Sequence, residues 1–130
     1  MRIYNLFPRL AGPVSQWEPH LARAADLGFN AVFINPVQKP GYSGSLYSVV
    51  DYQQLNPALV DPAAKATPEE QMRKVLKRAR VEYGLTPVVD LVINHCAFDS
   101  TLLKTNPEWF HWENGQVVHV SPQEYLRMRS

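Results

Sequence analysis

Two short apolar runs flank a stretch with helical periodicity near the start of the chain. The run RIYNLF (residues 2–7) is rich in strand formers, and FNAVFIN (residues 29–35) is largely apolar, as in a strand covered on both faces. Between them, apolar residues recur at helical spacing until Gly28, and Ser15 with Glu18 forms a capping-box pattern that predicts the helix start. The pattern predicts a strand–helix–strand unit, whose strands must be parallel.

A second helix and a third strand follow in the same order. Thr67 and Glu70 form another capping-box pattern, apolar residues then recur at helical spacing, and Gly84 suits the left-handed residue that follows a helix. The run LTPVVDLVIN (residues 85–94) predicts the next strand, interrupted by one carboxylate, Asp90. Alternating strands and helices predict an α/β fold with a parallel sheet.

In two segments, apolar residues keep neither the helical nor the strand spacing. Residues 35–66 are punctuated by prolines and glycines, and a loop this long inside a compact domain is usually functional or disordered. Residues 97–130 are irregular apart from Asn114-Gly115, a strong two-residue hairpin signal between FHWE and QVVHV. We therefore expect a long ordered loop after the second strand and a loop and hairpin region at the end.

Length and composition indicate one soluble domain. The chain has 130 residues, of which 45% are apolar and 19% charged, and this argues against a disordered chain. The net charge of +1 gives no reason to expect nucleic acid as a partner, and no run approaches the roughly 20 apolar residues that cross a membrane. A single cysteine forbids an internal disulfide and suits a reducing compartment, so we expect a cytoplasmic protein.

The candidate chemistry lies where the third strand ends. In parallel α/β folds, ligands bind at the carboxyl ends of the strands, and here the third end carries Asn94, His95 and Cys96. Asp90 precedes them among apolar neighbours, where an ionised carboxylate is costly unless it has partners. Asp90 therefore either anchors a neighbouring loop through backbone N–H groups or supports a site at the strand end.

Two other chemistries are weaker alternatives for the same cluster. His95, Cys96 and Asp99 offer metal ligands, but zinc needs three or four ligands and the other histidines lack metal-site spacing. A nucleophile pair of Cys96 and His95 conflicts with the alternation of side chains along a strand.

Aromatic side chains gather in the two irregular segments. They are Tyr42, Tyr47 and Tyr52 in the first segment and Trp109, Phe110 and Trp112 in the second. Their flat apolar faces with polar edges suit sugar rings, but they also suit loop packing, which composition alone favours.

Two motifs in order resemble the α-amylase family of enzymes that act on α-glucans. Residues 90–95, DLVINH, match the D-x-x-x-N-H motif that this family carries at the end of its third barrel strand. Residues 46–52, LYSVVDY, followed by Asn56-Pro57, resemble the family's G-Y-x-x-x-D-Y…D-P segment after the second strand. The departures from the family's usual Gly, Asp and Thr are Leu46, Asn56 and Cys96.

The resemblance implies roles for five residues. Tyr47 would stack on the sugar at the cleavage position, and His95 would hydrogen-bond its hydroxyl groups. Asp90 would support the site from beneath, with Asp51 as a second supporting residue. Asn94 matches a position that ligates a structural calcium in many members, although no second ligand can be named here. No cofactor is otherwise required, and the partner would be an α-glucan or a maltooligosaccharide.

The resemblance also implies a partial (β/α)8 TIM barrel. Residues 1–130 would form its first three strands and two helices, with the loop 35–66 and the region 97–130 as excursions, whereas a full barrel needs about 250 residues. The family's nucleophilic Asp and acid/base Glu follow later strands, so no catalytic residue is expected here. The chain alone should be inactive and should associate through its open strand edges.

The complete protein would then hydrolyse or transfer α-1,4-glucans by a retaining mechanism. The resemblance leaves hydrolysis and transfer undecided, because they differ in how water and acceptor reach the intermediate. The alternative is a non-catalytic α/β module that binds a sugar or a protein partner.

Overall fold

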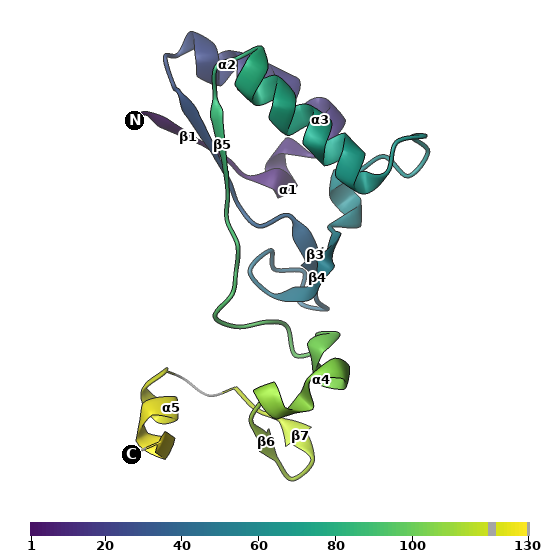
Figure 1. The fold of residues 1–130 in the computed structure, drawn as a ribbon, viewed down its shortest axis with the longest axis vertical. Helices are drawn as coiled ribbons and strands as arrows, with labels where there is room; N and C mark the ends of the chain where they lie inside the picture. Colours follow the sequence, from purple (N-terminus) through teal and green to yellow (C-terminus); the bar gives the residue numbers. More distant parts are fainter. Residues whose placement is uncertain (120–121, 130) are drawn as a thin grey trace.

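A parallel sheet of three strands forms the centre of the protein. The computed structural model describes residues 1–119 and 122–129. Strands β1 (Ile3–Leu6), β2 (Ala31–Ile34) and β5 (Thr86–Val89) pair in the order β1-β2-β5, all in parallel (Figure 1). β2 lies in the middle, and its Val32 and Ile34 are fully buried. The predicted α/β fold with parallel strands is confirmed.

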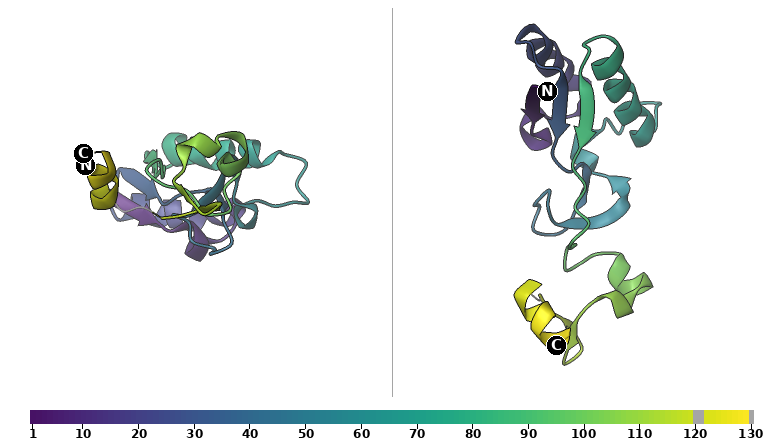
Figure 2. Two further views of the ribbon diagram at one scale, coloured as in Figure 1. Left: turned by 90° about the horizontal axis from the view of Figure 1, so that it is seen from below. Right: turned by 60° about the vertical axis from the view of Figure 1, so that its left-hand side comes forward.

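Two helices cover one face of this sheet. The described helices are α1 (Pro8–Ala11), α2 (Glu18–Asp26), α3 (Pro68–Val81), α4 (Leu102–Thr105) and α5 (Pro122–Arg129), with 3-10 turns at Val14–Gln16, Pro57–Leu59 and Pro107–Trp109. α2 and α3 pack against each other (Figures 1 and 2). Their buried side chains form one core with the sheet, which includes Trp17, Leu21, Ala24, Val32, Ile34, Met72, Val75 and Ala79. Within the described residues, no helix has the length and apolar character needed to cross a membrane.

The start of α2 differs from the predicted capping box. Ser15 lies in the 3-10 turn before the helix, and α2 begins at Glu18 with Trp17 as its N-cap residue, so this capping-box prediction is wrong. The Glu18 carboxylate instead accepts hydrogen bonds from Arg78 at 2.5 Å and from the Tyr83 hydroxyl at 2.7 Å. The Trp17 side chain is buried, which places the turn, and the ion pair then draws Glu18 towards α3. The hydrogen bond to Glu18 raises the pKa of Tyr83 above its usual value.

α3 begins and ends as the sequence predicts. The Thr67 hydroxyl accepts a hydrogen bond from the Glu70 N–H at 3.2 Å, and the Glu70 carboxylate accepts one from the Thr67 N–H at 2.7 Å. Pro68 stands at the first helical position, where its missing N–H leaves no bond unmade. Beyond the helix, Gly84 has a φ of 63°, the left-handed conformation that glycine adopts without strain. The second capping box is therefore confirmed.

The predicted loop 35–66 contains a small antiparallel sheet. β3 (Gln38–Pro40) pairs with β4 (Val49–Leu55), so the prediction of a loop without strands is wrong for these residues. The pairing shifts register on both sides of Lys39, and the alternation of apolar and polar residues that marks a strand is lost. This excursion extends from the carboxyl end of the parallel sheet and carries Tyr47 between its two strands (Figure 1).

β5 ends earlier than predicted. The strand covers Thr86–Val89, so the prediction of a strand over residues 85–94 is wrong in its second half. Its partner β2 ends at Ile34, and the buried Pro36 soon afterwards has no N–H with which to extend the pairing. The last bond runs from the Asp90 N–H to the Ile34 carbonyl oxygen at 2.8 Å. Asp90 therefore lies just past the strand end and not inside the strand.

The last part of the chain lies beyond the excursion, away from the parallel sheet (Figures 1 and 2). It holds α4, the hairpin of β6 (Trp112–Glu113) and β7 (Gln116–Val117), and α5. Asn114 and Gly115 form the turn with φ of 49° and 77°, so the predicted hairpin is confirmed. α4 and α5 were not predicted, because four and eight residues are too few for a helical period to stand out. The residues of this region that lie outside the described ones are Val120, Ser121 and Ser130.

Replacement of Leu21 by alanine tests the packing of helix on sheet. Leu21 is 2% exposed, so we expect Leu21→Ala to lower the free energy of opening of α2 and β2 by about 3 kcal/mol, as measured by native-state hydrogen exchange. Leu27→Ala is the matched control, because Leu27 follows the same helix and is 59% exposed. Its effect should stay below about 0.5 kcal/mol, and equal effects of the two substitutions would contradict the packing described here.

Candidate functional site

A row of hydrogen-bonded polar side chains crosses the carboxyl ends of the strands. Asn5 in β1 donates through Nδ2 to the Oδ1 atom of Asn35, 3.0 Å away, and Asn35 directly follows β2. The Nδ2 atom of Asn35 in turn donates to the Tyr47 hydroxyl at 2.7 Å. Because Leu6 pairs with Ile34 in register, the two strands end together and bring the two asparagines together. Asn5 and Asn35 were not predicted as site residues, although their places beside strand ends were a usable signal.

His95 joins this row from the segment that follows β5, six residues past the end of the strand. Its Nε2 atom lies 2.8 Å from the carbonyl oxygen of Tyr47, and its Nδ1 atom lies 2.9 Å from the Oδ1 atom of Asn94. A carbonyl oxygen only accepts hydrogen bonds, so Nε2 carries a proton and donates it. The structure thus brings together Tyr47 and His95, the two predicted substrate-binding residues, which are 48 positions apart. A ligand hydroxyl that binds the His95 ring has to replace one of these two bonds.

Tyr52 holds the backbone of His95. Its hydroxyl donates a hydrogen bond to the His95 carbonyl oxygen at 2.8 Å. Burial raises the pKa of Tyr52 above its usual value, and the charge of the nearby Cys96 raises it further. The Tyr52 phenol therefore keeps its proton, and with it this hydrogen bond, to a higher pH than an ordinary tyrosine.

The two predicted supporting carboxylates have different surroundings. Asp51 is half-buried in β4, and its Oδ1 atom accepts a hydrogen bond from the Gln53 N–H at 2.9 Å. Asp90 is half-buried, and none of the residues that the structure describes donates a hydrogen bond to its side chain. The expectation that Asp90 needs partners inside a strand is therefore wrong, because beyond the strand end water can solvate it. The supporting roles of both residues stay predictions.

The calcium position at Asn94 also stays a prediction. Calcium takes about six to eight oxygen ligands. Over residues 1–119 and 122–129, no group of three or more His, Cys, Asp or Glu side chains is arranged to hold a metal ion. The Oδ1 atom of Asn94 already faces the His95 ring, and Cys96 is half-buried. Asn94 is therefore the one residue for which a calcium role is predicted.

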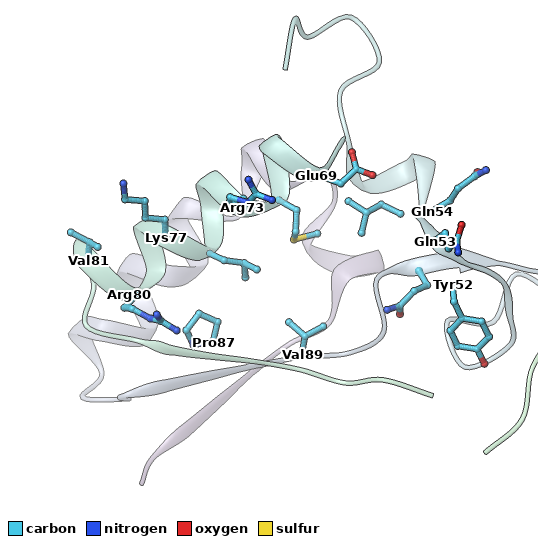
Figure 3. Close-up of a pocket in the computed structure, with 14 residues that line it drawn as sticks. Tyr52, Gln53, Gln54, Glu69, Arg73, Lys77, Arg80, Val81, Pro87 and Val89 are labelled. Atoms are coloured by element: carbon cyan, nitrogen blue, oxygen red, sulfur yellow. The ribbon is translucent and has the colours of Figure 1, made fainter. Parts of the chain in front are cut away.

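A separate cleft lies on the helix side of β5. It has a volume of about 860 Å³ and is bounded by α3, by β5 and by part of β4 (Figure 3). Its lining includes Arg73, Lys77, Arg80, Pro87 and Val89. We call this hollow the edge cleft, because it follows the unpaired edge of β5. Tyr52 lines one end of it and links it to the contact between Tyr47 and His95.

Comparison with known protein families shows the family of this chain. The family described as "Glycogen debranching enzyme, glucanotransferase domain" matches residues 1–121. The chain belongs to this family. The resemblance to the α-amylase family, which the two sequence motifs predicted, is thereby confirmed.

Individual relatives agree with this membership. The glycogen debranching enzyme of Saccharomyces cerevisiae is 31% identical over 94 residues, which cover 72% of this chain and 6% of the yeast protein. The noncanonic maltogenic alpha-amylase AmyB from Thermotoga neapolitana has 28% identity and a TM-score of 0.76, over 98% of this chain and 34% of that one. An alpha-amylase from Lactobacillus plantarum has 26% identity and a TM-score of 0.73, over 94% of this chain and 29% of that one. The chain thus spans between 6% and 34% of the length of these relatives.

The α-amylase-family fold agrees with the place of the candidate site. The structural relatives are TIM barrels, in which ligands bind at the carboxyl ends of the strands. In this α-amylase-family chain, the row of polar side chains from Asn5 to His95 lies at that end of the sheet. The edge cleft lies on the helix-covered side of the sheet.

Replacement of Tyr52 by phenylalanine tests its contact with His95. The raised pKa of Tyr52 means that the folded state holds this proton more tightly, so the stabilisation is complete below about pH 10 and is lost as the pH rises through the folded pKa. Tyr52→Phe removes this alkaline step. The difference between the tyrosine absorbance titrations of wild type and variant should show a phenol that ionises above about pH 10. A difference curve centred at or below that pH would contradict the buried contact.

Proposed function

We propose that this chain is the N-terminal part of the catalytic (β/α)8 barrel of an enzyme that acts on α-1,4-glucans. The proposal is supported by membership of the α-amylase family, whose relatives include a glycogen debranching enzyme and a maltogenic alpha-amylase. The complete enzyme would use a retaining mechanism, in which one carboxylate attacks the sugar and a second carboxyl group protonates the leaving oxygen. Its substrate would be an α-glucan or a maltooligosaccharide.

The contact between Tyr47 and His95 is the observation that carries the proposal. The Tyr47 side chain is 41% exposed, so its ring is open for stacking against a sugar. Asn35 donates to the Tyr47 hydroxyl, so the phenol proton stays available to another acceptor. A sugar ring offers C–H faces to an aromatic ring and hydroxyl groups to polar atoms. Tyr47 and His95 together would supply both kinds of contact.

Transfer to another sugar is the reaction that we favour over hydrolysis. The family that matches residues 1–121 is described as a glucanotransferase domain. In a retaining mechanism, one covalent intermediate serves both reactions, and the outcome depends on whether water or a sugar hydroxyl reaches it. Loops of the later barrel units would make that choice.

We propose further that the 130-residue chain alone is inactive. A retaining enzyme needs two carboxyl groups about 5 Å apart, flanking the bond that breaks. Asp51 and Asp99 each accept a hydrogen bond from a backbone N–H, those of Gln53 and Tyr42, as loop-shaping side chains do. Asp90 would be a support. No residue of this chain is therefore assigned to catalysis.

The unpaired edge of β5 supports the barrel proposal. Apolar residues continue beyond this strand in exposed positions, with Leu91 exposed by 54% and Ile93 by 81%. A parallel strand added to this edge needs a right-handed crossover, which would place its helix beside α3 and over the edge cleft (Figure 3). Since three cationic side chains of α3 line the cleft, we expect acidic residues on that helix. Without such a cover, the chain should self-associate through the β5 edge.

A non-catalytic sugar- or protein-binding module is the alternative function. It would use the same contact between Tyr47 and His95 but would need no further strand. Sedimentation velocity and denaturant unfolding distinguish the barrel fragment from the non-catalytic module. A chain that stays monomeric at all concentrations and unfolds in one sharp transition would favour the module and count against self-association.

Maltoheptaose binding by the chain tests the proposed sugar site. We expect Tyr47→Ala to weaken binding about tenfold, because the stacking ring and its hydrogen-bonded hydroxyl are both lost. Tyr42→Ala is the matched control, since Tyr42 lies on the same loop, is 77% exposed and keeps its backbone bond to Asp99. NMR titration of 13C-labelled tyrosines measures both affinities. Equal losses in the two variants would contradict the role given to Tyr47.

The same samples test the predicted inactivity. Maltoheptaose incubated with the wild-type chain should remain intact, because the two carboxyl groups of a retaining mechanism are not assigned within the chain. Chromatography of the sugars detects both shortened and lengthened products. Conversion at a rate that Asp90→Asn abolishes would refute the prediction.

A further inference from the structure

The loop of residues 41–48, here called the tyrosine loop, joins β3 to β4 and carries Tyr47 (Figure 1). Its own turns hold its shape, because the Gly41 N–H donates to the Ser48 carbonyl oxygen at 2.7 Å and the Gly44 N–H donates to the Gly41 carbonyl oxygen at 2.9 Å. These bonds determine the form of the loop but not its place relative to the strand ends. That place depends on contacts with other elements.

Two side chains hold the tyrosine loop from the sheet side. Arg9 of α1 donates to the Gly44 carbonyl oxygen. His95 donates to the Tyr47 carbonyl oxygen at 2.8 Å. Both bonds go to backbone oxygens, so they depend on where the loop lies and not on which side chains it carries.

Asp99 and Gly41 form a third contact at the start of the loop. The Oδ2 atom of Asp99 accepts a hydrogen bond from the Tyr42 N–H at 3.1 Å. A Cβ atom at position 41 would lie 2.4 Å from Oδ1 of Asp99 and 2.5 Å from the Cβ atom of Ala97, closer than real side chains pack. The φ of Gly41 does not lie in the positive range that favours glycine. The close approach of Asp99 and Ala97 therefore requires glycine here, and backbone conformation does not.

The segment opposite Gly41, residues 97–101, is held in place by backbone hydrogen bonds. Ala97 is 2% exposed, and its N–H donates to the Val49 carbonyl oxygen at 2.9 Å. Four residues further on, the Thr101 N–H donates to the Val50 carbonyl oxygen at 2.9 Å. Residues 97–101 are thus anchored to β4 at two points. A side chain added at position 41 must therefore displace the tyrosine loop itself.

We propose that Asp99, with Gly41 opposite it, is a positioning residue for the sugar site. It holds the tyrosine loop against the segment that follows His95, so that Tyr47 and His95 stay together at the proposed sugar site. The role in sugar binding rests on the proposed function, whereas the role in placing the loop does not. Asp99 acts through the loop and does not touch the sugar.

Two substitutions of Asp99 test the hydrogen bond to the tyrosine loop. Asparagine keeps a side-chain oxygen that accepts the Tyr42 N–H, and alanine removes it. Amide hydrogen exchange at Tyr42 and maltoheptaose titration are measured on the full 130-residue chain. We expect Asp99→Ala to speed the exchange and to weaken binding, each about tenfold, while Asp99→Asn stays within about twofold of wild type.

Gly41→Ala tests the close approach from the other side and should produce the same two changes as Asp99→Ala. Gly84→Ala is the matched control. Gly84 has a φ of 63° and no atom within 4 Å of an added Cβ, so this substitution strains the backbone without touching the tyrosine loop. Exchange at Tyr42 and maltoheptaose binding should stay within about twofold of wild type in the control. The comparison separates lost stability from lost loop position.

Three results would overturn the proposal. These are unchanged exchange at Tyr42 in Asp99→Ala, faster exchange with unchanged maltoheptaose binding, and equal losses in Asp99→Asn and Asp99→Ala. If the wild-type chain does not bind maltoheptaose, the proposed function fails in this chain. Exchange at Tyr42 then decides by itself whether Asp99 places the loop.

Discussion

The in-register parallel pairing of β1, β2 and β5 is the constraint on which the candidate site depends. Leu6, Ile34 and Val89 lie at one level across the sheet, so the three strands end at the same edge. Asn35, directly after β2, and His95, six residues after β5, both reach Tyr47 from this edge, although they come from distant parts of the chain. A slip of one residue in any strand would turn its buried face to solvent and would separate these side chains.

The excursion between β2 and α3 completes the site that the sheet begins. Tyr47 receives a hydrogen bond from Asn35 on its hydroxyl and one from His95 on its carbonyl oxygen. A hydrogen bond contributes only about 0.5–1.5 kcal/mol net, but two of them to one residue make this loop position more favourable than others. The same excursion is held at its start by Asp99 and Gly41. Sheet edge, loop and following segment thus act as one unit.

Sequence patterns correctly predicted the features that depend only on residues close together in the sequence. The cap of α3 depends only on Thr67 and on Glu70, three positions later. The β6–β7 turn depends only on Asn114 and Gly115, which adopt positive φ. The same kind of pattern failed at α2, because the carboxylate of Glu18 is bound by Arg78, 60 positions away. The β3–β4 pair was missed for a related reason, since its shifting register leaves no alternation to read.

The sequence by itself determined the order of the three parallel strands and of α2 and α3 between them, the family, and Tyr47 and His95 as the candidate sugar-binding residues. Only the tertiary structure decided that these two touch, that Asn35 bonds the Tyr47 hydroxyl, and that Asp99 packs where Gly41 has no side chain. The partners in the contacts of His95 and Asp99 with the tyrosine loop are 48 and 57 positions apart. Such contacts depend on how strands pair and how loops close over them, and a periodicity of two or of 3.6 residues carries no information about either.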